Sequence, residues 1–395
     1  MSDPRDLLDA GALRSRGSLK WTGTSADVAA WVAESDLGVA PAVLEAVHDA
    51  VGRGLLGYLP PAVRTSLGES FASWAEHAYD WRVDPARVRP VGHVTEGLRV
   101  AIDLFSRPGS PVILPTPAYM PFVTAPAVWG REVIQIPMVP DGEGRSTLDL
   151  DAVDAAFRAG AHLFVLVNPQ NPTGRVARRA ELEALAEVVE RHGGRVFADE
   201  IHAPLVHAPG RHVPYASVSP TAAAHTVTGV SASKAWNIPG LKCAQVVLTG
   251  DDDVAVWSRE DDLLTEGAST IGAVANAAAY TVGRDWLTDT LAYLDGNRRA
   301  FAATLAEAAP RARHRMPEGT YLAWVDLRDA LAALPEGDGP GTEPLGRWLR
   351  RTTGVALTDG ALCGTAGVGH VRVNLAMPRP LVVEAGRRLA ACLDR

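Results

Sequence analysis

The sequence predicts an α/β fold in two parts: a large domain built on a mostly parallel β-sheet with helices on both faces, and a smaller α+β domain after it. Two observations indicate this fold. Between about residues 94 and 283, short apolar runs alternate with stretches in which apolar residues recur at helical spacing. After Gly283 the alternation gives way to one long helical stretch followed by a few strand-like runs. Short runs that are apolar throughout are typical of parallel strands covered on both faces.

Six apolar runs are expected to be strands of the large sheet. They are PVILP at 111, REVIQIPMV at 131, HLFVLVN at 162, RVFADE at 195, HTVTGVS at 225 and QVVLTG at 245. Two of the segments between them, LDLDAVDAAFRAG and RRAELEALAEVVERHGG, have the apolar spacing of helices. The second ends at Gly193 and Gly194, and glycine is a common helix stop.

The remaining segments predict the smaller domain and its borders. A long helix is expected from WLTDTLAYLDGNRRAFAATLAEAA at 286, and strands from TYLAWVDL at 320 and HVRVNLAM at 370. Residues 1–45 lack a strand–helix repeat, and Pro41 suits a helix start. We therefore expect an N-terminal segment at 1–45 that packs on the small domain, a large domain at 46–284 and a small C-terminal domain at 285–395.

The composition argues against several classes of protein. Lys and Arg number 38 against 46 Asp and Glu, a net charge of −8, which does not favour nucleic acid or an anionic membrane as a partner. The start of the chain lacks the features of a signal peptide, and no run is long enough to span a bilayer, so a cytoplasmic protein is expected. Three cysteines without a Cys-x-x-Cys pair, and histidines spaced by five at 202, 207 and 212, do not predict a metal site.

Polar residues follow three of the predicted strands directly. Asn171 comes after HLFVLVN, Asp199 and His202 after RVFADE, and Lys234 after HTVTGVS. In open α/β sheets ligands bind at the carboxyl ends of the strands, so these side chains are expected to share a site. Lys234 stands among Ser231, Ala232 and Ser233, whose small side chains leave its amine open to a flat ligand.

These residue types are the ones that pyridoxal 5′-phosphate (PLP) requires. A buried carboxylate such as Asp199 needs a cation, which a protonated pyridine nitrogen supplies, and a lysine amine can form an imine with the PLP aldehyde. The phosphate needs amides and hydroxyls at a helix N-terminus. Val94 and Thr95 in GHVTEGLRVAI provide these groups, with Glu96 in the first turn.

Ten ordered motifs then give a resemblance that covers nearly the whole chain. They are SLKW at 18, WVAESDLGVAP at 31, LLGYLP at 55, PTPAYMPF at 115, NPQNPTGRV at 168, ADEIHAPLV at 198, SASKAWNIPGLK at 231, YLDGNR at 293, GTYLAWVDL at 319 and GVALTDGALCG at 354. The chain resembles fold-type-I PLP enzymes of the class I/II aminotransferase superfamily, and most closely their MalY/PatB branch of cystathionine or cysteine-S-conjugate β-lyases. The resemblance implies a mostly parallel seven-stranded sheet in the large domain.

The resemblance also implies roles for individual residues. Lys234 would be the Schiff-base lysine and Asp199 the partner of the pyridine nitrogen, with Tyr119 over the face of the ring. Asn171 and His202 would flank the ring hydroxyl. The groups that would hold the phosphate are Val94, Thr95, Ser231, Ser233 and Lys242.

Two further residues are assigned by the resemblance, and one departs from it. Tyr58 would reach the neighbour's site in a homodimer with shared active sites, where it would join Lys234, Asp199 and Tyr119 as a catalytic group that contacts the cofactor. Arg372, together with Asn171, would bind the substrate α-carboxylate. His93 stands where the superfamily usually has glycine, so its side chain either points away or projects toward the cofactor and substrate.

The branch-level motifs favour α,β-elimination of an S-substituted L-cysteine to a thiol, pyruvate and ammonia. The residues that bind the cofactor are shared by other reactions, so transamination, decarboxylation and oxidative deamination remain alternatives. A non-catalytic PLP-binding regulator is a further alternative, disfavoured because the chain keeps Lys234 and carries no N-terminal helix-turn-helix extension.

Overall fold

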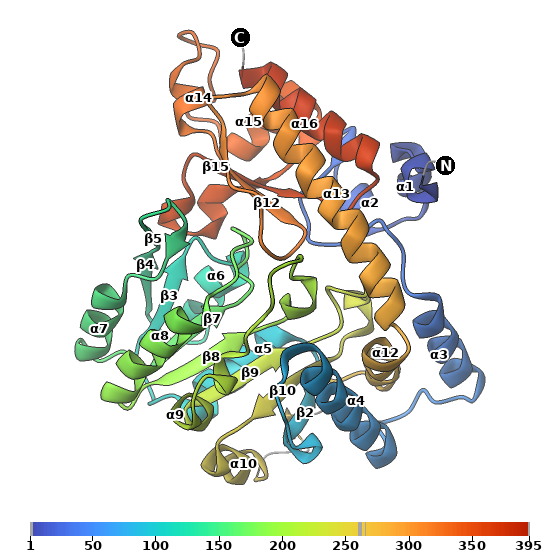
Figure 1. The fold of residues 1–395 in the computed structure, drawn as a ribbon, viewed down its shortest axis with the longest axis vertical. Coiled ribbons are helices and arrows are strands. Elements are labelled where there is room, and N and C mark those ends of the chain that lie inside the picture. Colours follow the sequence, from blue (N-terminus) through green and yellow to red (C-terminus); the bar gives the residue numbers. More distant parts are fainter. Residues whose placement is uncertain (1–2, 260–262, 265, 394–395) are drawn as a thin grey trace.

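A seven-stranded sheet forms the centre of the larger part of the molecule (Figure 1). The computed structural model describes residues 3–259, 263–264 and 266–393. The strands lie in the order β2 (Val88–Val91), β10 (Ala244–Leu248), β9 (Thr226–Val230), β8 (Arg195–Asp199), β7 (Leu163–Val167), β3 (Val112–Thr116) and β4 (Val133–Pro137). Only β10 is antiparallel to its neighbours.

The mostly parallel sheet is therefore confirmed, and all six predicted runs are strands within it. The seventh strand, β2, was not predicted from an apolar run, because Arg89 and Pro90 interrupt its short sequence. It pairs with β10 at one edge of the sheet, where proline is tolerated in a strand.

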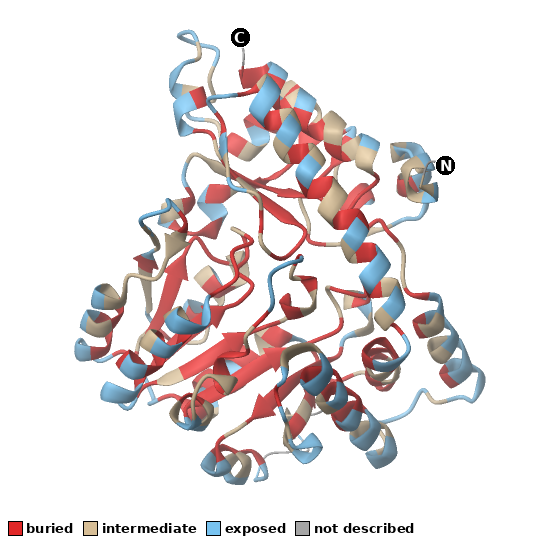
Figure 2. Cartoon of the chain, in the orientation of Figure 1, coloured by how far each residue is buried: buried red, intermediate tan, exposed pale blue. Residues whose placement is uncertain are grey.

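Helices cover both faces of the sheet. One face packs on α5 (Val94–Phe105), α6 (Met120–Val128) and α10 (Asp251–Trp257). The other packs on α7 (Leu150–Arg158), α8 (Arg179–Arg191) and α9 (Pro220–Ala224). In β7 the side chains of Val165 and Leu166 point to opposite cores, so an uninterrupted apolar run satisfies both faces. Figure 2 shows the inner strands of the sheet as buried, while the edge strand β4 is only partly covered.

A third group of helices packs at the β2–β10 end. It consists of α3 (Pro41–Gly52), α4 (Pro61–Tyr79) and α12 (Thr270–Thr281). Pro41 is the first residue of α3, as its position in the sequence predicted. Trp74 of α4 meets Trp236 edge-to-face at 5.4 Å between ring centroids, and Trp236 follows Lys234 closely in the chain. This aromatic cluster fixes the turn that carries Lys234.

The C-terminal part of the chain is the predicted α+β unit. Its four-stranded sheet has the order β11 (Arg313–His314), β12 (Leu322–Asp326), β15 (His370–Asn374) and β14 (Thr358–Asp359). The remaining elements are α13 (Arg284–Ala308), α14 (Arg328–Ala332), α15 (Leu345–Thr353), β13 (Val355–Ala356) and α16 (Arg379–Leu393). Short 3-10 turns and a hairpin complete the chain: η1 (Pro4–Leu7), η2 (Pro85–Arg87), η3 (Ala203–Leu205), η4 (Tyr215–Ser217), η5 (Pro239–Leu241), η6 (Gly360–Cys363), η7 (Thr365–Gly367), β5 (Val139–Pro140) and β6 (Ser146–Thr147).

The N-terminal segment lies against this smaller part. After α1 (Ala10–Ser15) and α2 (Leu19–Thr22), β1 (Val28–Ala29) pairs in parallel with β13. The fully buried Lys20 forms an ion pair with Asp36 at 2.7 Å, and Nε1 of Trp21 donates a hydrogen bond to the same carboxylate at 2.9 Å. These contacts fix the stretch from Trp31 onward, while the borders at 45 and 284 stay predictions.

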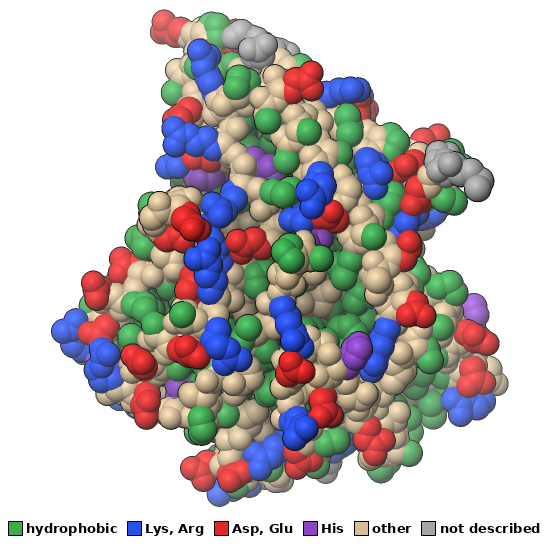
Figure 3. Space-filling model, viewed as in Figure 1, with side chains coloured by type: hydrophobic (Ala, Val, Ile, Leu, Met, Phe, Trp, Pro, Cys, Tyr) green, Lys and Arg blue, Asp and Glu red, His purple; other side chains and the backbone are tan. Residues whose placement is uncertain are grey.

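The surface carries charges of both signs. On the face shown in Figure 3, basic and acidic side chains are interspersed, and many of them form exposed pairs such as Arg178 with Glu143 at 3.1 Å. Within the described ranges, no helix combines the length and apolar character needed to cross a membrane.

Candidate active site

Ten of the predicted cofactor residues line one cavity of about 240 Å³ at the carboxyl ends of β7, β8 and β9. They are Val94, Thr95, Tyr119, Asn171, Asp199, His202, Ser231, Ser233, Lys234 and Lys242. Their proximity follows from topology, because parallel neighbouring strands present their carboxyl ends at the same edge of the sheet.

The amine of Lys234 lies in this cavity at the turn that follows β9. Its Nζ donates a hydrogen bond to the carbonyl oxygen of Ala33 at 3.0 Å. Burial of the amine, with a smaller contribution from the Arg372 charge, lowers the pKa of Lys234 to about 8. A larger fraction of this lysine is therefore neutral near physiological pH, as a nucleophilic or basic amine requires.

Asp199 ends β8 and is 4% exposed. One of its oxygens accepts a hydrogen bond from the Ile201 amide at 3.1 Å, and within the described residues no cationic side chain forms an ion pair with it. Burial, only partly offset by that amide and by the Lys234 charge, raises the pKa of Asp199 to about 7. A buried carboxylate without a cationic partner fits a ligand that brings a protonated nitrogen.

His202 and Asn171 lie in the same cavity. His202 is 2% exposed, its Nδ1 has no hydrogen-bond partner among the described residues, and burial lowers its pKa to about 3, so the ring is neutral. The Asn171 side-chain oxygen accepts a hydrogen bond from Nη1 of Arg372 at 3.0 Å. A buried ring nitrogen without a hydrogen-bond partner is a second feature that indicates a ligand, because a bound ligand could supply that partner.

The start of α5 forms the anion-binding end of the cavity. Val94 and Thr95 are its first two residues, so their amides have no partner within the helix. The exposed Lys242 lines this cavity from η5 with a left-handed backbone, φ 49°. The Ser231 hydroxyl donates to the Cys243 carbonyl at 2.8 Å and accepts the Ser233 amide at 3.0 Å, so it also shapes the turn.

The His93 side chain, whose direction the sequence left open, is fixed by a hydrogen bond at the start of α5. Its backbone is extended, and its Nδ1 accepts the Glu96 amide at 3.0 Å, so the imidazole is the N-cap of α5. Glu96 in turn accepts the Gly92 amide at 2.7 Å. His93 lines the cavity, and with Nδ1 used as an acceptor the neutral ring carries its proton on Nε2.

A larger cavity of about 620 Å³ adjoins the first and shares Ala33, Tyr119 and Lys234 with it. Arg372, on β15, lines this second cavity and is 1% exposed. Its Nη2 donates to the Trp31 carbonyl at 2.9 Å and to the Thr358 hydroxyl at 3.2 Å, while its Nε has no partner among the described residues. This buried guanidinium forms no ion pair with a carboxylate of the described chain. A substrate carboxylate would supply the missing counter-charge.

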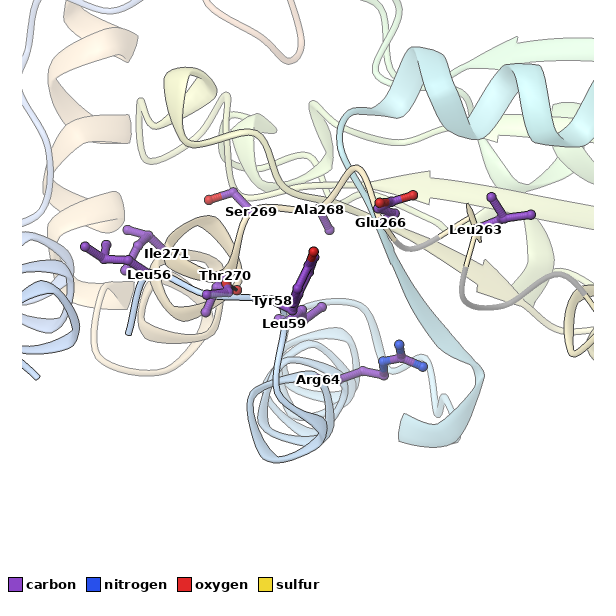
Figure 4. Close-up of a pocket in the computed structure, with 11 residues that line it drawn as sticks. Leu56, Tyr58, Leu59, Arg64, Leu263, Glu266, Ala268, Ser269, Thr270 and Ile271 are labelled. Atoms are coloured by element: carbon purple, nitrogen blue, oxygen red, sulfur yellow. Dashed lines mark hydrogen bonds between the residues drawn. The ribbon is translucent and has the colours of Figure 1, made fainter. Parts of the chain in front are cut away.

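Tyr58 is the predicted site residue that the fold of one chain does not bring to these cavities. It is 95% exposed and lines a separate surface pocket of about 860 Å³. Figure 4 shows its side chain between Arg64 of α4 and the loop that carries Ala268 and Ser269. Within a single chain, Tyr58 therefore contributes nothing to the Lys234 cavity.

Sequence reasoning did not find several residues of the two cavities. The Ala33 carbonyl accepts hydrogen bonds from Lys234 and from the Tyr321 hydroxyl, and the Trp31 carbonyl accepts from Arg372. Both residues lie in the motif WVAESDLGVAP, but a role played by a main-chain carbonyl leaves no mark on the side chain. Arg347 and Arg350 of α15 line the larger cavity from a segment that carried no motif.

The lysine, the unpartnered carboxylate and the helix N-terminus supply, in one cavity, the three kinds of group that PLP needs: an imine-forming amine, a partner for the ring nitrogen and donors for the phosphate. The fold and this cavity together define the class of PLP-dependent enzymes built on a mostly parallel seven-stranded sheet. Within that class, the chain belongs to the class I and II aminotransferase family, whose model matches residues 32–389.

Comparison with individual proteins gives closer similarities. The cystathionine β-lyase of Corynebacterium glutamicum is 36% identical, over 96% of this chain and 98% of its own. The cystathionine β-lyase PatB of Bacillus subtilis is 28% identical over 95% and 97% of the two chains. Among solved structures, the PLP-bound C–S lyase of Staphylococcus hominis is 26% identical and superimposes with a TM-score of 0.90 over 99% of both chains.

Proposed function

We propose that this chain is a PLP-dependent carbon–sulfur β-lyase. Its substrate would be cystathionine or another S-substituted L-cysteine, and its products a thiol, pyruvate and ammonia. The relatives named as cystathionine β-lyases and C–S lyase, matched over nearly their whole length, support this activity. The observation that carries the proposal is the pair of cavities: the Lys234 amine and the Arg372 guanidinium line one space with room beyond them for a substituent on sulfur.

Arg372 and Lys234 have different roles in this proposal, one in binding the substrate and the other in moving a proton. Arg372 holds the substrate carboxylate and so turns the Cα–H bond, not the carboxylate bond, toward Lys234. When bound, PLP supplies the electron sink for the electrons that the departing Cα proton leaves. Lys234 takes that proton, the Cβ–S bond breaks, and its electron pair leaves with sulfur as a thiolate that picks up a proton. Water then converts the released enamine into pyruvate and ammonia.

Two residues keep the cofactor in its working state in this proposal. Asp199 would accept a hydrogen bond from the ring nitrogen and stabilise its protonated form, because the carboxylate is buried and forms no ion pair with a described residue. Tyr119, the N-cap residue of α6, lines the cavity and would stack on the face of the ring.

The decisive experiment follows four products in one reaction. Purified holoenzyme is given S-substituted L-cysteines, and pyruvate, free thiol, carbon dioxide and the cofactor spectrum are recorded together. Elimination predicts equal amounts of pyruvate and thiol without added keto acid. The alternative of transamination, which the family name includes, would instead give turnover that depends on a keto acid, and carbon dioxide release would indicate decarboxylation. Either of these results in place of pyruvate and thiol would overturn the proposal.

We further propose that the active unit is a cytoplasmic homodimer with shared sites. Tyr58 and the neighbouring Leu56 are 95% and 68% exposed, and they line one surface pocket with Leu59 and Ile271, an apolar patch that a second chain would cover. Cys243, Cys363 and Cys392 are buried free thiols, which suits a reducing compartment.

Mixing inactive Lys234→Ala chains with Tyr58→Phe chains should restore part of the activity, because one site of each heterodimer would carry neither change. Light scattering that finds a monomer at micromolar concentration would contradict the dimer.

A further inference from the structure

The outer wall of the larger cavity carries two arginines that have no partner in the described part of the chain. Arg347 and Arg350 lie one turn apart on α15 and both line the cavity that contains Arg372 and Lys234. Both are exposed, and neither guanidinium forms a hydrogen bond or an ion pair with a described residue. Other exposed arginines pair nearby, as Arg351 does with Glu343 at 2.8 Å. The cavity mouth is thus a place where positive charge is left unneutralised.

The acidic side chain in the same wall does not neutralise them. Asp359 is the one carboxylate among the lining residues, against four cationic side chains. Its two oxygens accept backbone amides, from Gly346 at 2.9 Å and from Ala361 at 3.0 Å. Asp359 therefore serves to fix the start of α15 against the cavity wall, and the net charge of the lining remains positive.

The position of Arg347 within its helix is not explained by helix stability. It lies in the first turn of α15, which contains no acidic residue, and a cation there is disfavoured by the helix dipole. The buried side of the helix is formed by Trp348 and Leu349. The first turn of α15 and its two arginines together present a positive potential to whatever enters the cavity from outside.

Apart from its charged side chains, the wall of this cavity is largely apolar. Trp31, Met120, Pro121, Leu357 and Leu362 contribute to it. A volume of about 620 Å³ falls in the range of pockets that enclose extended small molecules, and exceeds what an amino-acid head group held at Arg372 needs. A substituent with an apolar stem and a charged end matches this composition of the lining.

We infer that the preferred substrates are S-substituted L-cysteines whose sulfur substituent ends in a carboxylate or another anionic group, which Arg347 and Arg350 bind. This inference rests on the proposed carbon–sulfur lyase function, and it names the substrate class of that same site. The α-carboxylate is held at Arg372, the apolar wall contacts the stem of the substituent, and the two arginines of α15 receive its distal charge. They determine specificity without touching the reacting atoms.

The test compares two substrates of equal size that differ in charge. S-(2-carboxyethyl)-L-cysteine carries the anion and S-(2-carbamoylethyl)-L-cysteine carries the neutral amide in its place. For the holoenzyme, kcat/KM is measured from thiol release, and the dissociation constant of each compound from its effect on the visible absorbance of the bound cofactor. The acid should be preferred about tenfold, since exposed arginine–carboxylate pairs contribute about threefold each. The preference should fall as salt rises, because screening weakens exposed pairs.

Variants of α15 locate the effect. Arg347→Gln and Arg350→Gln should each lower the acid-to-amide ratio about threefold, the double variant should bring it near one, and Arg350→Lys should retain most of it. Arg351→Gln is the matched control, because Arg351 lies on the same helix, is paired with Glu343 and does not line the cavity. Its ratio should equal that of the unmodified chain.

The outcomes separate this inference from the lyase proposal. An unmodified enzyme that binds acid and amide equally, or glutamine variants that keep the full preference, would overturn the role of Arg347 and Arg350. Absence of thiol release from both compounds would count against the lyase function, while the dissociation constants would still report the preference for an anion.

Discussion

Arg372 is the residue for which the structure gives the most definite expectation, through the change Arg372→Gln. Its Nε–H has no acceptor, and its Nη1 donates to the Asn171 oxygen and, at 3.8 Å, to the weak acceptor Sδ of Met120, so one of its five N–H groups is free and a second is held only by sulfur. A substrate carboxylate that takes both N–H groups forms two charge-assisted hydrogen bonds at about 1.5–3 kcal/mol each, so their loss removes about 3–6 kcal/mol of transition-state stabilisation. This corresponds to a fall of about 10² to 10⁴ in kcat/KM.

The assay uses a substrate that lacks the group in question. Thiol release is measured for an S-substituted L-cysteine and for the matching S-substituted cysteamine, which has no carboxylate. Arg372→Gln should lose activity only on the amino acid, and the two compounds should then react at similar low efficiency. Arg372→Lys should fall between, because an ammonium is a point charge without the planar fork of a guanidinium. The visible absorbance of bound cofactor should persist in both variants, since Arg372 does not line the smaller cavity.

An equal loss of activity on both compounds would contradict carboxylate binding by Arg372. That result would mean that Arg372 acts by holding Trp31, Thr358 and Asn171 in place and not by binding a carboxylate. A thermal midpoint measured on the same variants separates loss of folding from loss of function.

Three further predictions address the smaller cavity. Lys234→Ala should abolish the covalent colour of the bound cofactor and all turnover; a variant that keeps full visible absorbance after dialysis would remove Lys234 from its proposed role. In the cofactor-free chain, the Asp199 contribution to stability should be fully present below about pH 4 and lost as pH rises to about 7, because burial raises its pKa from 3.8 to about 7. The difference in thermal midpoint between the unmodified chain and Asp199→Asn should follow this pH course, and a difference independent of pH would contradict it. His93→Ala should lower the free energy of unfolding by about 1 kcal/mol through loss of the α5 cap, and His93→Asn should restore it; denaturant unfolding of both variants checks this, and equal stabilities would show that the cap is not what His93 provides.

The sequence determined the sheet and the place of the cofactor site. Apolar runs such as HLFVLVN identify strands buried on both faces, because each residue of such a run must find apolar contacts whichever way it points. The polar residues that directly follow β7, β8 and β9 then mark one edge of the sheet. Asn171, Asp199 and Lys234 could be assigned to a common cavity on this ground alone.

Tertiary structure decided the rest, because it depends on contacts between segments that are distant in the chain. The Lys234 amine is held by a carbonyl of the N-terminal segment, 201 residues away, and Arg372 by Asn171 at the same separation. No local pattern records which carbonyl meets which donor. The sequence likewise left open whether the His93 side chain points away from the cofactor or toward it. The tertiary structure shows that its Nδ1 accepts a hydrogen bond from the Glu96 amide.

The substrate end of the site shows the same limit most clearly. The sequence pattern indicates only that Arg347 and Arg350 are exposed residues of an amphipathic helix. It does not show whether an arginine side chain forms an ion pair. Only the packing of α15 against β14 places them in the wall of the cavity that also contains Lys234. The sequence by itself therefore determined the fold, because it follows from burial along the chain, and the class of cofactor chemistry, because Lys234, Asp199 and the ordered motifs are local features of the sequence. The positive charge of Arg347 and Arg350 in the wall of the larger cavity could be found only in the tertiary structure, because it depends on which surfaces the two parts of the molecule bring together.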